Sequence, residues 1–274
     1  MNFVPWRISE GMTSPDPDPL TTHQLFEHDR VADGYASARP FLHPEVFARV
    51  RDLIRPPGPF RRALDVGCGT GLSSVALLEL AREVTGVDVS VPMLLRARKA
   101  EHLHYLASSA EDLPFREGSF DLVAACGSID WVDRARFLPR AAELLTTGGW
   151  LVPLDFGDAG RSTEMPDLES WHRQVLQSTF PTPDSRDPMV TGDEAARFGF
   201  GKPGDHPFET EFSFTARRYA DFLMTESGVI AAVEYGDRSA EEIRGWLVKQ
   251  LSSLFGGEAR AVTFSGYIQV LPKL

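Results

Sequence analysis

The sequence predicts an α/β fold in which a mostly parallel sheet is covered by helices on both faces. From about residue 60, short apolar runs typical of buried strands alternate with amphipathic segments typical of helices. This alternation predicts a parallel sheet, because parallel neighbours need a crossover connection that a helix usually supplies. The 274 residues, 42% of them hydrophobic, are enough for one large α/β domain, or for a core domain with a cap.

The N-terminal part precedes the alternation. Repeated Pro-Asp pairs and a shortage of residues to bury predict a disordered tail over residues 1–20. We expect helices in LTTHQLFEHDRVADGYASARP and in HPEVFARVRDLI, before the break RPPGP. Residues 21–58 are therefore expected to form an N-terminal helical cap segment.

Residues 59–156 carry the alternating core. The expected strands are RRALDVG, EVTGVDVS, LHYLASS, SFDLVAACGSI and GGWLVPLDF. The expected helices are GLSSVALLELA, VPMLLRARKA and ARFLPRAAELLT, and Gly148 and Gly149 follow the end of the last. Because open parallel sheets bind ligands at the carboxyl ends of their strands, we expect the site at that edge.

The pattern changes after the fifth strand. Residues 157–206 are rich in Gly, Pro and Asp with one or two helices, and we expect a cap insertion over the active site. Residues 207–274 contain two more expected strands, FETEFSFTA and AVTFSGYIQVLP, and helices in RRYADFLMTES and SAEEIRGWLVKQLSSLF. We expect this last part to complete the core sheet.

Composition narrows the range of partners. There are 28 Lys and Arg against 39 Asp and Glu, and the net charge of −11 disfavours binding to nucleic acid or to an anionic membrane. With no apolar run of spanning length and no signal-peptide pattern, we expect a cytoplasmic protein with no membrane partner. The two cysteines are too few for a disulfide framework or a four-thiolate zinc site, and we expect no metal.

The phrase ALDVGCGTG places Gly67, Gly69 and Gly71 between a strand and the next helix. Glycines in such a turn let the backbone approach a ligand closely. The spacing is one residue shorter than the G-x-G-x-x-G fingerprint of dinucleotide folds, and Asp65 just before it does not suit a pyrophosphate. A ligand with a cationic or neutral polar head suits the loop better, and the alternative is a tight turn that binds nothing.

Asp88 closes the next expected strand, 17 residues after Gly71. In dinucleotide folds an acid at this distance binds the ribose, since a carboxylate accepts hydrogen bonds from two vicinal hydroxyls. We therefore expect a ligand that contains a ribose and lacks a pyrophosphate.

Together with these two features, the stretch SSAEDLPFREGSFDLVAACGSIDWVD resembles one known family, the class I S-adenosylmethionine-dependent methyltransferases. Residues 65–71 resemble the family's first motif, whose backbone passes under the methionine part of the cofactor. Asp88 matches its ribose-binding acid, and the long stretch is similar to its adenine side. The resemblance, which spans about residues 60–156, implies a Rossmann-like seven-stranded sheet, mostly parallel with an antiparallel edge strand, and a helical cap.

The resemblance also implies the residues that bind the cofactor. The acid that commonly contacts the adenine amino group is Ser109 here, so Glu111 or the backbone is expected to take its place. FEHDRVADGYASARP is similar to the N-terminal helix of trans-aconitate and ubiquinone/menaquinone methyltransferases, which places Tyr35 and Arg39 near the cofactor carboxylate. The implied residues of the core are Asp65, Gly67, Cys68, Gly69, Gly71, Asp88, Val89, Met93, Ser109, Ala110, Glu111 and Cys126.

The sequence thus predicts an enzyme, monomeric or homodimeric, that moves a methyl group from S-adenosyl-L-methionine to a small-molecule metabolite. Oxygen is the first choice of acceptor atom, with carbon and nitrogen as alternatives. Since the donor is already activated, the protein mainly aligns the reactants and excludes water. A general base, where the acceptor needs one, is expected to be Asp130, with His28, Asp155 and His172 as weaker candidates. Asp130 could instead cap the helix that follows it.

Three other functions compete with this prediction. An NAD-dependent oxidoreductase needs the longer glycine spacing. A nucleic-acid base methyltransferase is expected to carry a Pro-Pro-aromatic tetrad after the fourth strand, where this chain has CGSIDW. A protein that binds S-adenosylmethionine for a non-methylating or regulatory role shares the same motifs, and this alternative stays open.

Overall fold

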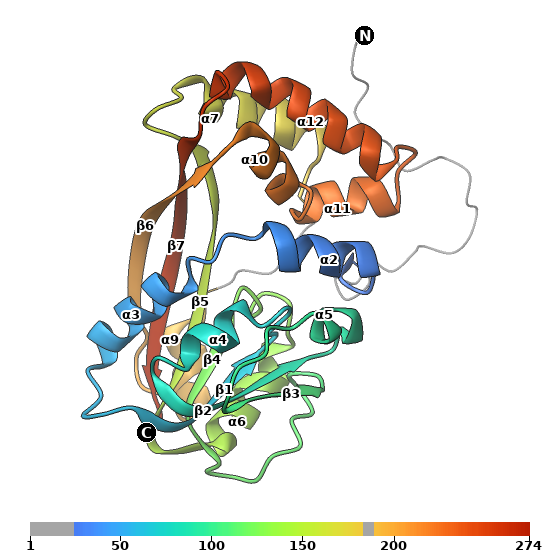
Figure 1. The fold of residues 1–274 in the computed structure, drawn as a ribbon. Helices are drawn as coiled ribbons and strands as arrows, with labels where there is room; N and C mark the ends of the chain where they lie inside the picture. Colours follow the sequence, from blue (N-terminus) through green and yellow to red (C-terminus); the bar gives the residue numbers. More distant parts are fainter. Residues whose placement is uncertain (1–24, 183–188) are drawn as a thin grey trace. The chain divides into compact units, whose positions relative to one another are not determined.

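A computed structural model describes residues 25–182 and 189–274 (Figure 1). The expected tail over residues 1–20 lies outside the described residues. Among the helices of the described ranges, none combines the length and the apolar character needed to cross a membrane.

The structure is built on one seven-stranded sheet, in the order β3-β2-β1-β4-β5-β7-β6 (Figure 1). The neighbours from β3 to β5 pair in parallel, and the sheet carries an antiparallel edge strand. This confirms the predicted fold class. The strands are β1 Phe60–Val66, β2 Ala81–Asp88, β3 Leu103–Ala107, β4 Phe120–Cys126, β5 Leu145–Arg161, β6 Gly204–Phe214 and β7 Arg260–Pro272.

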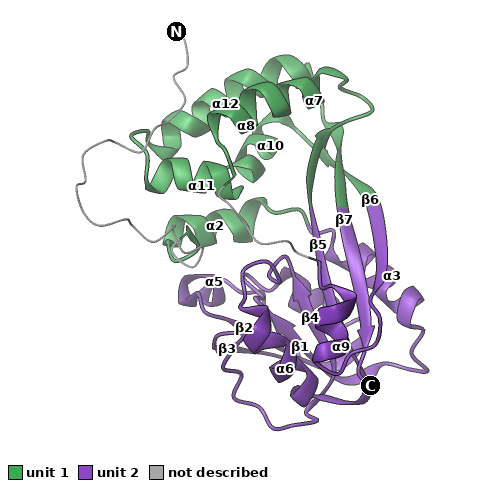
Figure 2. Cartoon of the chain, turned by 180° about the vertical axis from the view of Figure 1, so that it is seen from behind, with its two compact units in different colours: residues 1–40, 157–184, 209–265 green, residues 41–156, 185–208, 266–274 purple. Residues whose placement is uncertain are grey.

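The chain separates into two compact units (Figure 2). Unit 1 comprises residues 1–40, 157–184 and 209–265, and unit 2 comprises residues 41–156, 185–208 and 266–274. Each of the three segments expected around the core, 21–58, 157–206 and 207–274, is divided between the two units. That residues 157–206 cap the active site stays a prediction.

Unit 2 covers both faces of the parallel sheet with helices. Because successive strand residues point to opposite faces, Ala63 packs with α3 and α4, whereas Leu64 and Val66 pack with α6 and α9. Two apolar layers therefore hold the strands whose carboxyl ends are expected to bind the ligand. The helices of unit 2 are α3 His43–Ile54, α4 Leu72–Leu77, α5 Val91–Leu95, α6 Arg134–Leu144 and α9 Gly192–Arg197.

The fifth strand is longer than predicted. We expected Gly148 and Gly149 to follow the end of a helix, but α6 ends at Leu144 and β5 begins at once at Leu145. The pairing with β4 shifts register between Phe120 and Leu122. The two glycines therefore lie within β5, at an irregularity of the strand.

Two core helices are shorter than predicted, since α4 ends at Leu77 and α5 ends at Leu95. After α4 ends at Leu77, a turn follows in which the Leu80 N–H donates to the Leu77 carbonyl at 2.9 Å. The Leu80 carbonyl then accepts from the Phe60 N–H at 2.8 Å, which starts the pairing of β1 with β2. Tertiary pairing therefore ends a helix that the apolar pattern alone would continue.

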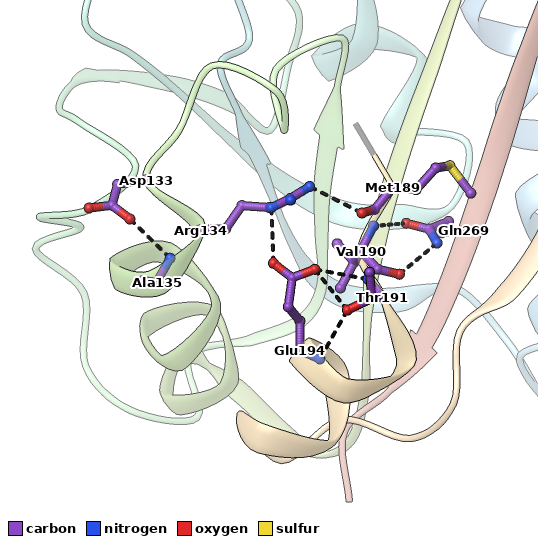
Figure 3. Close-up of polar contacts among 8 residues, drawn as sticks. All are labelled: Asp133, Arg134, Ala135, Met189, Val190, Thr191, Glu194 and Gln269. Atoms are coloured by element: carbon purple, nitrogen blue, oxygen red, sulfur yellow. Dashed lines mark hydrogen bonds and ion pairs between the residues drawn. The ribbon is translucent and has the colours of Figure 1, made fainter. Parts of the chain in front are cut away.

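The segment around α9 is fastened to α6 and β7 (Figure 3). The Arg134 guanidinium donates to the Met189 carbonyl at 3.1 Å and pairs with the Glu194 carboxylate at 3.2 Å. The Val190 N–H donates to the Gln269 side-chain oxygen at 2.8 Å. Residues 189–197 are therefore part of the core unit.

Unit 1 is mainly helical, with an aromatic core. Five fully buried aromatic side chains pack with neighbouring ring centroids 5.4–6.2 Å apart: Phe214, Tyr219, Phe222, Phe255 and Phe264. The Arg30 guanidinium on α2 pairs with the Glu234 carboxylate on α11 at 2.6 Å. The helices of unit 1 are α2 Asp29–Ala38, α7 Asp167–Trp171, the π-helix η1 His172–Leu176, α8 Gln177–Thr179, α10 Ala216–Leu223, α11 Ser227–Glu234 and α12 Ala240–Phe255.

Unfolding measurements can test the packing of α6. Phe137 is fully buried between α6 and the sheet, so Phe137→Ala should lower the free energy of unfolding by about 3–5 kcal/mol. Arg136→Ala on the same helix is the matched control, because its ion pair with Asp112 is exposed and should change stability by less than about 1 kcal/mol. Urea titrations followed by circular dichroism measure both, and equal effects would contradict this packing.

Candidate functional site

The glycine loop, residues 67–71, joins β1 to α4 and rests on the end of β2. The N–H groups of Gly67 and Cys68 both donate to the Val87 carbonyl, at 2.8 and 3.0 Å. Gly71 closes the turn by donating to the Cys68 carbonyl at 2.8 Å, and its φ of +75° is one that favours glycine. The loop is therefore held at the carboxyl ends of two adjacent parallel strands.

The surroundings of the three glycines differ. A Cβ atom at Gly67 would overlap the Ser128 side chain, and one at Gly71 would overlap the Tyr105 hydroxyl. At Gly69, which has a φ of +51°, a Cβ atom would meet nothing within 4 Å. Only Gly69 therefore leaves open space beside the loop, while the other two make room for the protein itself.

Asp88 is held directly against this open part of the loop. Its Oδ2 atom accepts a hydrogen bond from the Gly69 N–H at 2.7 Å, and its Oδ1 atom accepts from the Ser90 N–H at 2.8 Å. A carboxylate offers about four acceptor positions, which is why an acidic side chain suits the binding of ribose hydroxyls. The structure thus brings together two residues that the sequence singled out, Gly69 and Asp88.

Asp65 lies fully buried at the end of β1. Its Oδ2 atom accepts from the hydroxyls of Ser73 at 2.6 Å and Ser74 at 2.5 Å, whereas no described residue donates to Oδ1. Burial raises the pKa of Asp65 to about 6, the two serines oppose this rise, and the charge of Asp88 adds to it. The sequence analysis missed the two serines, although LSS directly follows the glycines.

The remaining expected core residues surround the same edge of the sheet. The segment after β3 is fastened beside β2, because the Ser108 N–H donates to the Asp88 carbonyl at 3.0 Å. Glu111 in that segment accepts from the Asp133 N–H at 2.8 Å, and Val89 is 43% exposed. Ser109 is half-buried, as is Cys126 at the end of β4, and Cys68, Met93 and Ala110 are buried.

A second group of polar side chains comes from β4, β5 and β7. Asp130 is half-buried after β4, and burial together with the charge of Asp155 raises its pKa to about 6. The pKa of the Tyr267 hydroxyl is also raised, by burial and then by the charges of Asp155 and Asp130. Sequence analysis missed Tyr267, which nothing in the strand pattern of AVTFSGYIQVLP distinguishes.

Asp130 does not cap α6. The N-cap is Asp133, whose carboxylate accepts from the Ala135 N–H at 3.0 Å (Figure 3). The alternative interpretation of Asp130 as a helix cap is therefore wrong. Within the described ranges, no group of three or more His, Cys, Asp or Glu side chains is arranged to hold a metal ion.

Tyr35 and Arg39 lie in unit 1, one turn apart at the end of α2. The Arg39 guanidinium donates to the Tyr35 hydroxyl at 3.0 Å and to the Thr225 carbonyl at 2.7 Å, and it pairs with the Glu226 carboxylate at 3.3 Å. It also lies over the Tyr35 ring, 4.5 Å from the centroid. Their expected contact with a cofactor carboxylate stays a prediction.

The two candidate histidines also belong to unit 1. His172 lies 3.5 Å from the Asp158 carboxylate, which accepts a short hydrogen bond from the buried Tyr219 hydroxyl. His28 lies 3.5 Å from the Glu234 carboxylate. Each histidine has an acidic partner within its unit, and a role as general base stays a prediction for both.

Comparison with known proteins identifies the core. Residues 64–152 match a family described as a methyltransferase domain. A demethylmenaquinone methyltransferase of Thermus thermophilus is 39% identical over 39% of this chain and 52% of its own. A ubiquinone biosynthesis O-methyltransferase of Xanthomonas campestris is 34% identical over 50% of this chain and 64% of its own. This chain spans about half the length of most curated relatives it matches.

A solved structure shares the fold over a larger part of the chain. It is described as a type II methyltransferase from Anaeromyxobacter dehalogenans, with a TM-score of 0.65 and 21% identity, and the match covers 84% of this chain and 95% of that one. At this identity the likeness concerns the fold. Residues 64–152 thus match a methyltransferase domain, and the fold around that domain is shared with a methyltransferase structure.

Proposed function

We propose that this protein transfers a methyl group from S-adenosylmethionine to a small-molecule acceptor. The observation that carries the proposal is the hydrogen bond from the Gly69 N–H to Asp88, beside the open space at Gly69. A carboxylate at the end of β2, held against a loop that a ligand can approach, suits a ligand that contains a ribose.

The residues present fit this cofactor, which supplies a methyl group on an activated sulfonium when it is bound. Asp88 would accept hydrogen bonds from the ribose hydroxyls, and the backbone at Gly69 would lie against the methionine part. Val89, partly exposed next to Asp88, would pack on the adenine ring, with Ser109 and Glu111 at the polar edge of that ring. These are the roles that the resemblance to the methyltransferase family implies.

The charges around the loop favour a cationic ligand. Asp65 has one carboxylate oxygen without a donor among the described residues, and its ionised form adds negative potential to that of Asp88. A sulfonium and an ammonium group are stabilised in such a potential, whereas a pyrophosphate is repelled. Because Asp65 is fully buried, we propose that it acts through its electric field and not by direct contact.

For the acceptor, we propose a small molecule with a hydroxyl group. The X. campestris relative is named as an O-methyltransferase, and Asp130 suits a general base because its raised pKa of about 6 is closer to neutral pH than that of an exposed carboxyl. Asp155 and Tyr267 come from neighbouring strands of the same unit and would orient the acceptor. Carbon and nitrogen remain the alternatives.

For Arg39 we propose the role that the resemblance implies, binding of the cofactor carboxylate, in exchange for a partner that it holds in the structure. It pairs with Glu226 at 3.3 Å, and both groups belong to unit 1. A planar guanidinium binds one carboxylate in the same way as another, so the exchange requires no new chemistry. We propose this role for Arg39, with Tyr35 supporting its guanidinium.

Calorimetric titration with S-adenosylmethionine, S-adenosylhomocysteine and NAD tests the proposal. We expect micromolar binding of the first two ligands and none of NAD, followed by methyl transfer when small hydroxylated metabolites are screened. Binding of NAD alone would contradict the proposed function. Binding of S-adenosylmethionine without transfer to any hydroxyl, amine or carbon acid would favour a regulatory role.

The ribose contact predicts the effect of Asp88→Ala. Loss of hydrogen bonds to a charged acceptor should weaken binding by about 1.5–3 kcal/mol, which raises Kd about tenfold or more. The effect should be equal for S-adenosylhomocysteine and for 5′-methylthioadenosine, since both carry the ribose. Isothermal titration calorimetry measures both values.

Asp121→Ala is the matched control for Asp88→Ala. The Asp121 carboxylate also accepts from two backbone N–H groups, those of Arg61 at 2.8 Å and Arg62 at 3.1 Å, but it lies at the start of β4. It should affect folding stability in a similar way and leave both Kd values unchanged. Equal loss of binding in the two variants would refute the ribose role of Asp88.

The charge of Asp65 predicts a dependence of binding on pH. With a pKa of about 6 in the free protein, Asp65 is protonated at pH 5 and ionised at pH 7.5. A bound ammonium group favours the ionised form, so affinity for S-adenosylhomocysteine should rise by about tenfold as pH increases through 6. In Asp65→Asn this part of the pH dependence should disappear.

The neutral ligand 5′-methylthioadenosine serves as the control for the titration of other groups. It has no ammonium group, so its affinity should stay constant over the same range. An effect of the Asp65 charge on binding is excluded if the affinities of both ligands change with pH in the same way. It is also excluded if the affinity of Asp65→Asn for S-adenosylhomocysteine changes with pH as that of the wild type does.

A further inference from the structure

We propose that Tyr105 on β3 is a positioning residue that sets the shape of the glycine loop under the amino-acid end of the cofactor. The proposal rests on the proposed function. Tyr105 is absent from the residues that the sequence analysis implied, and its side chain reaches the loop across the intervening strand β2.

Gly86 on β2 has no side chain, and this lets the Tyr105 ring lie across that strand. Gly86 is the register partner of Tyr105 in the parallel pair β2–β3. A Cβ atom at Gly86 would lie only 2.8 Å from the Cδ1 and Cε1 atoms of the ring, closer than real Cβ contacts. Since the backbone of Gly86 is not in the left-handed region, close contact is the reason for a glycine here.

The hydroxyl end of Tyr105 fills the space next to Gly71. A Cβ atom at Gly71 would overlap this hydroxyl, which donates to the Arg98 carbonyl at 2.7 Å. The Arg98 N–H in turn donates to the Thr70 carbonyl at 3.1 Å. Tyr105 and the backbone at Arg98 therefore support two consecutive residues of the loop, Thr70 and Gly71.

The ring is also a neighbour of the group that holds Asp65. A Cβ atom at Gly86 would lie 2.8 Å from the Ser74 hydroxyl as well as from the Tyr105 ring, so both side chains occupy the same face of Gly86. The Ser74 hydroxyl donates to Asp65 Oδ2 at 2.5 Å. Tyr105 thus limits the space available to Ser74, and through Ser74 it orients the Asp65 carboxylate.

These contacts all lie on one side of the loop. Tyr105 acts on Thr70, Gly71 and, through Ser74, on Asp65, whereas the ribose acid Asp88 has its own bonds to Gly69 and Ser90. The two ends of the ligand should therefore depend on different residues. Tyr105 should matter for the amino-acid end and not for the nucleoside end.

Binding of two ligands to Tyr105→Leu tests this distinction. We expect Kd for S-adenosylhomocysteine to rise about tenfold, the equivalent of about one lost hydrogen bond, while Kd for 5′-methylthioadenosine changes less than about twofold. Tyr105→Phe keeps the ring over Gly86 and should recover part of the loss. Isothermal titration calorimetry gives the values, and thermal melting shows that each variant is folded.

Phe115→Leu is the matched control. Phe115 is a partly buried aromatic residue of the same unit that packs edge-on against Phe120, with ring centroids 5.1 Å apart. It should lower the melting temperature without changing either Kd. If Tyr105→Leu weakens both ligands equally, or weakens neither, the positioning role is overturned. If the wild-type protein does not bind S-adenosylhomocysteine, the proposed function itself fails, and this inference fails with it.

A double-mutant cycle tests the contact without any ligand. Gly86→Ala should lower the melting temperature of the wild type, because the new methyl group meets the Tyr105 ring. In the Tyr105→Ala background the same change should have a smaller effect, since only Ser74 remains in its way. Additive shifts in melting temperature would show that the ring does not press on Gly86, and would overturn the inference.

Discussion

The candidate site depends on the hydrogen bond between the Gly69 N–H and Asp88. This bond joins the carboxyl end of β2 to the loop that leaves β1, two parallel strands held in register from Phe60 to Val66. It fixes the one glycine of the loop beside which space is open, and it places a carboxylate next to that space. The other contacts of the loop, from Val87, Ser128 and Tyr105, hold the backbone in the shape that this bond requires.

The same arrangement concentrates negative charge. Asp65 and Asp88 lie at the ends of adjacent strands, and burial raises the pKa of Asp65, with a smaller contribution from the charge of Asp88. An unpaired buried carboxylate destabilises a fold unless it is protonated or compensated. Hydrogen bonds from Ser73 and Ser74 compensate part of this cost, and a cationic ligand above the loop would add to that compensation.

The sequence predicted this edge of the sheet because its determinants are local. Strand, glycines, helix and acid follow one another within 60–88, and parallel pairing places the carboxyl ends of β1 and β2 together. The reasons for Gly67 and Gly71 were not predictable, since they depend on Ser128 and Tyr105, which only the folded chain brings near. Helix α11 was missed because GVIAA is buried on all sides and shows no amphipathic period. The division of residues 157–206 between two units depends on long-range packing that composition does not show.

The acceptor side of the proposed site combines residues inside and outside the matched domain. Asp65, Asp88 and Asp130 lie within the matched domain, residues 64–152, whereas Asp155 and Tyr267 lie beyond it. The glycine loop tolerates little change in backbone shape, because Gly67 and Gly71 have no room for a side chain and Gly69 leaves the space beside the loop open. Residues contributed by β5 and β7 are free of that constraint. The matched domain ends before them, so the match bears more directly on the cofactor than on the molecule that receives the methyl group.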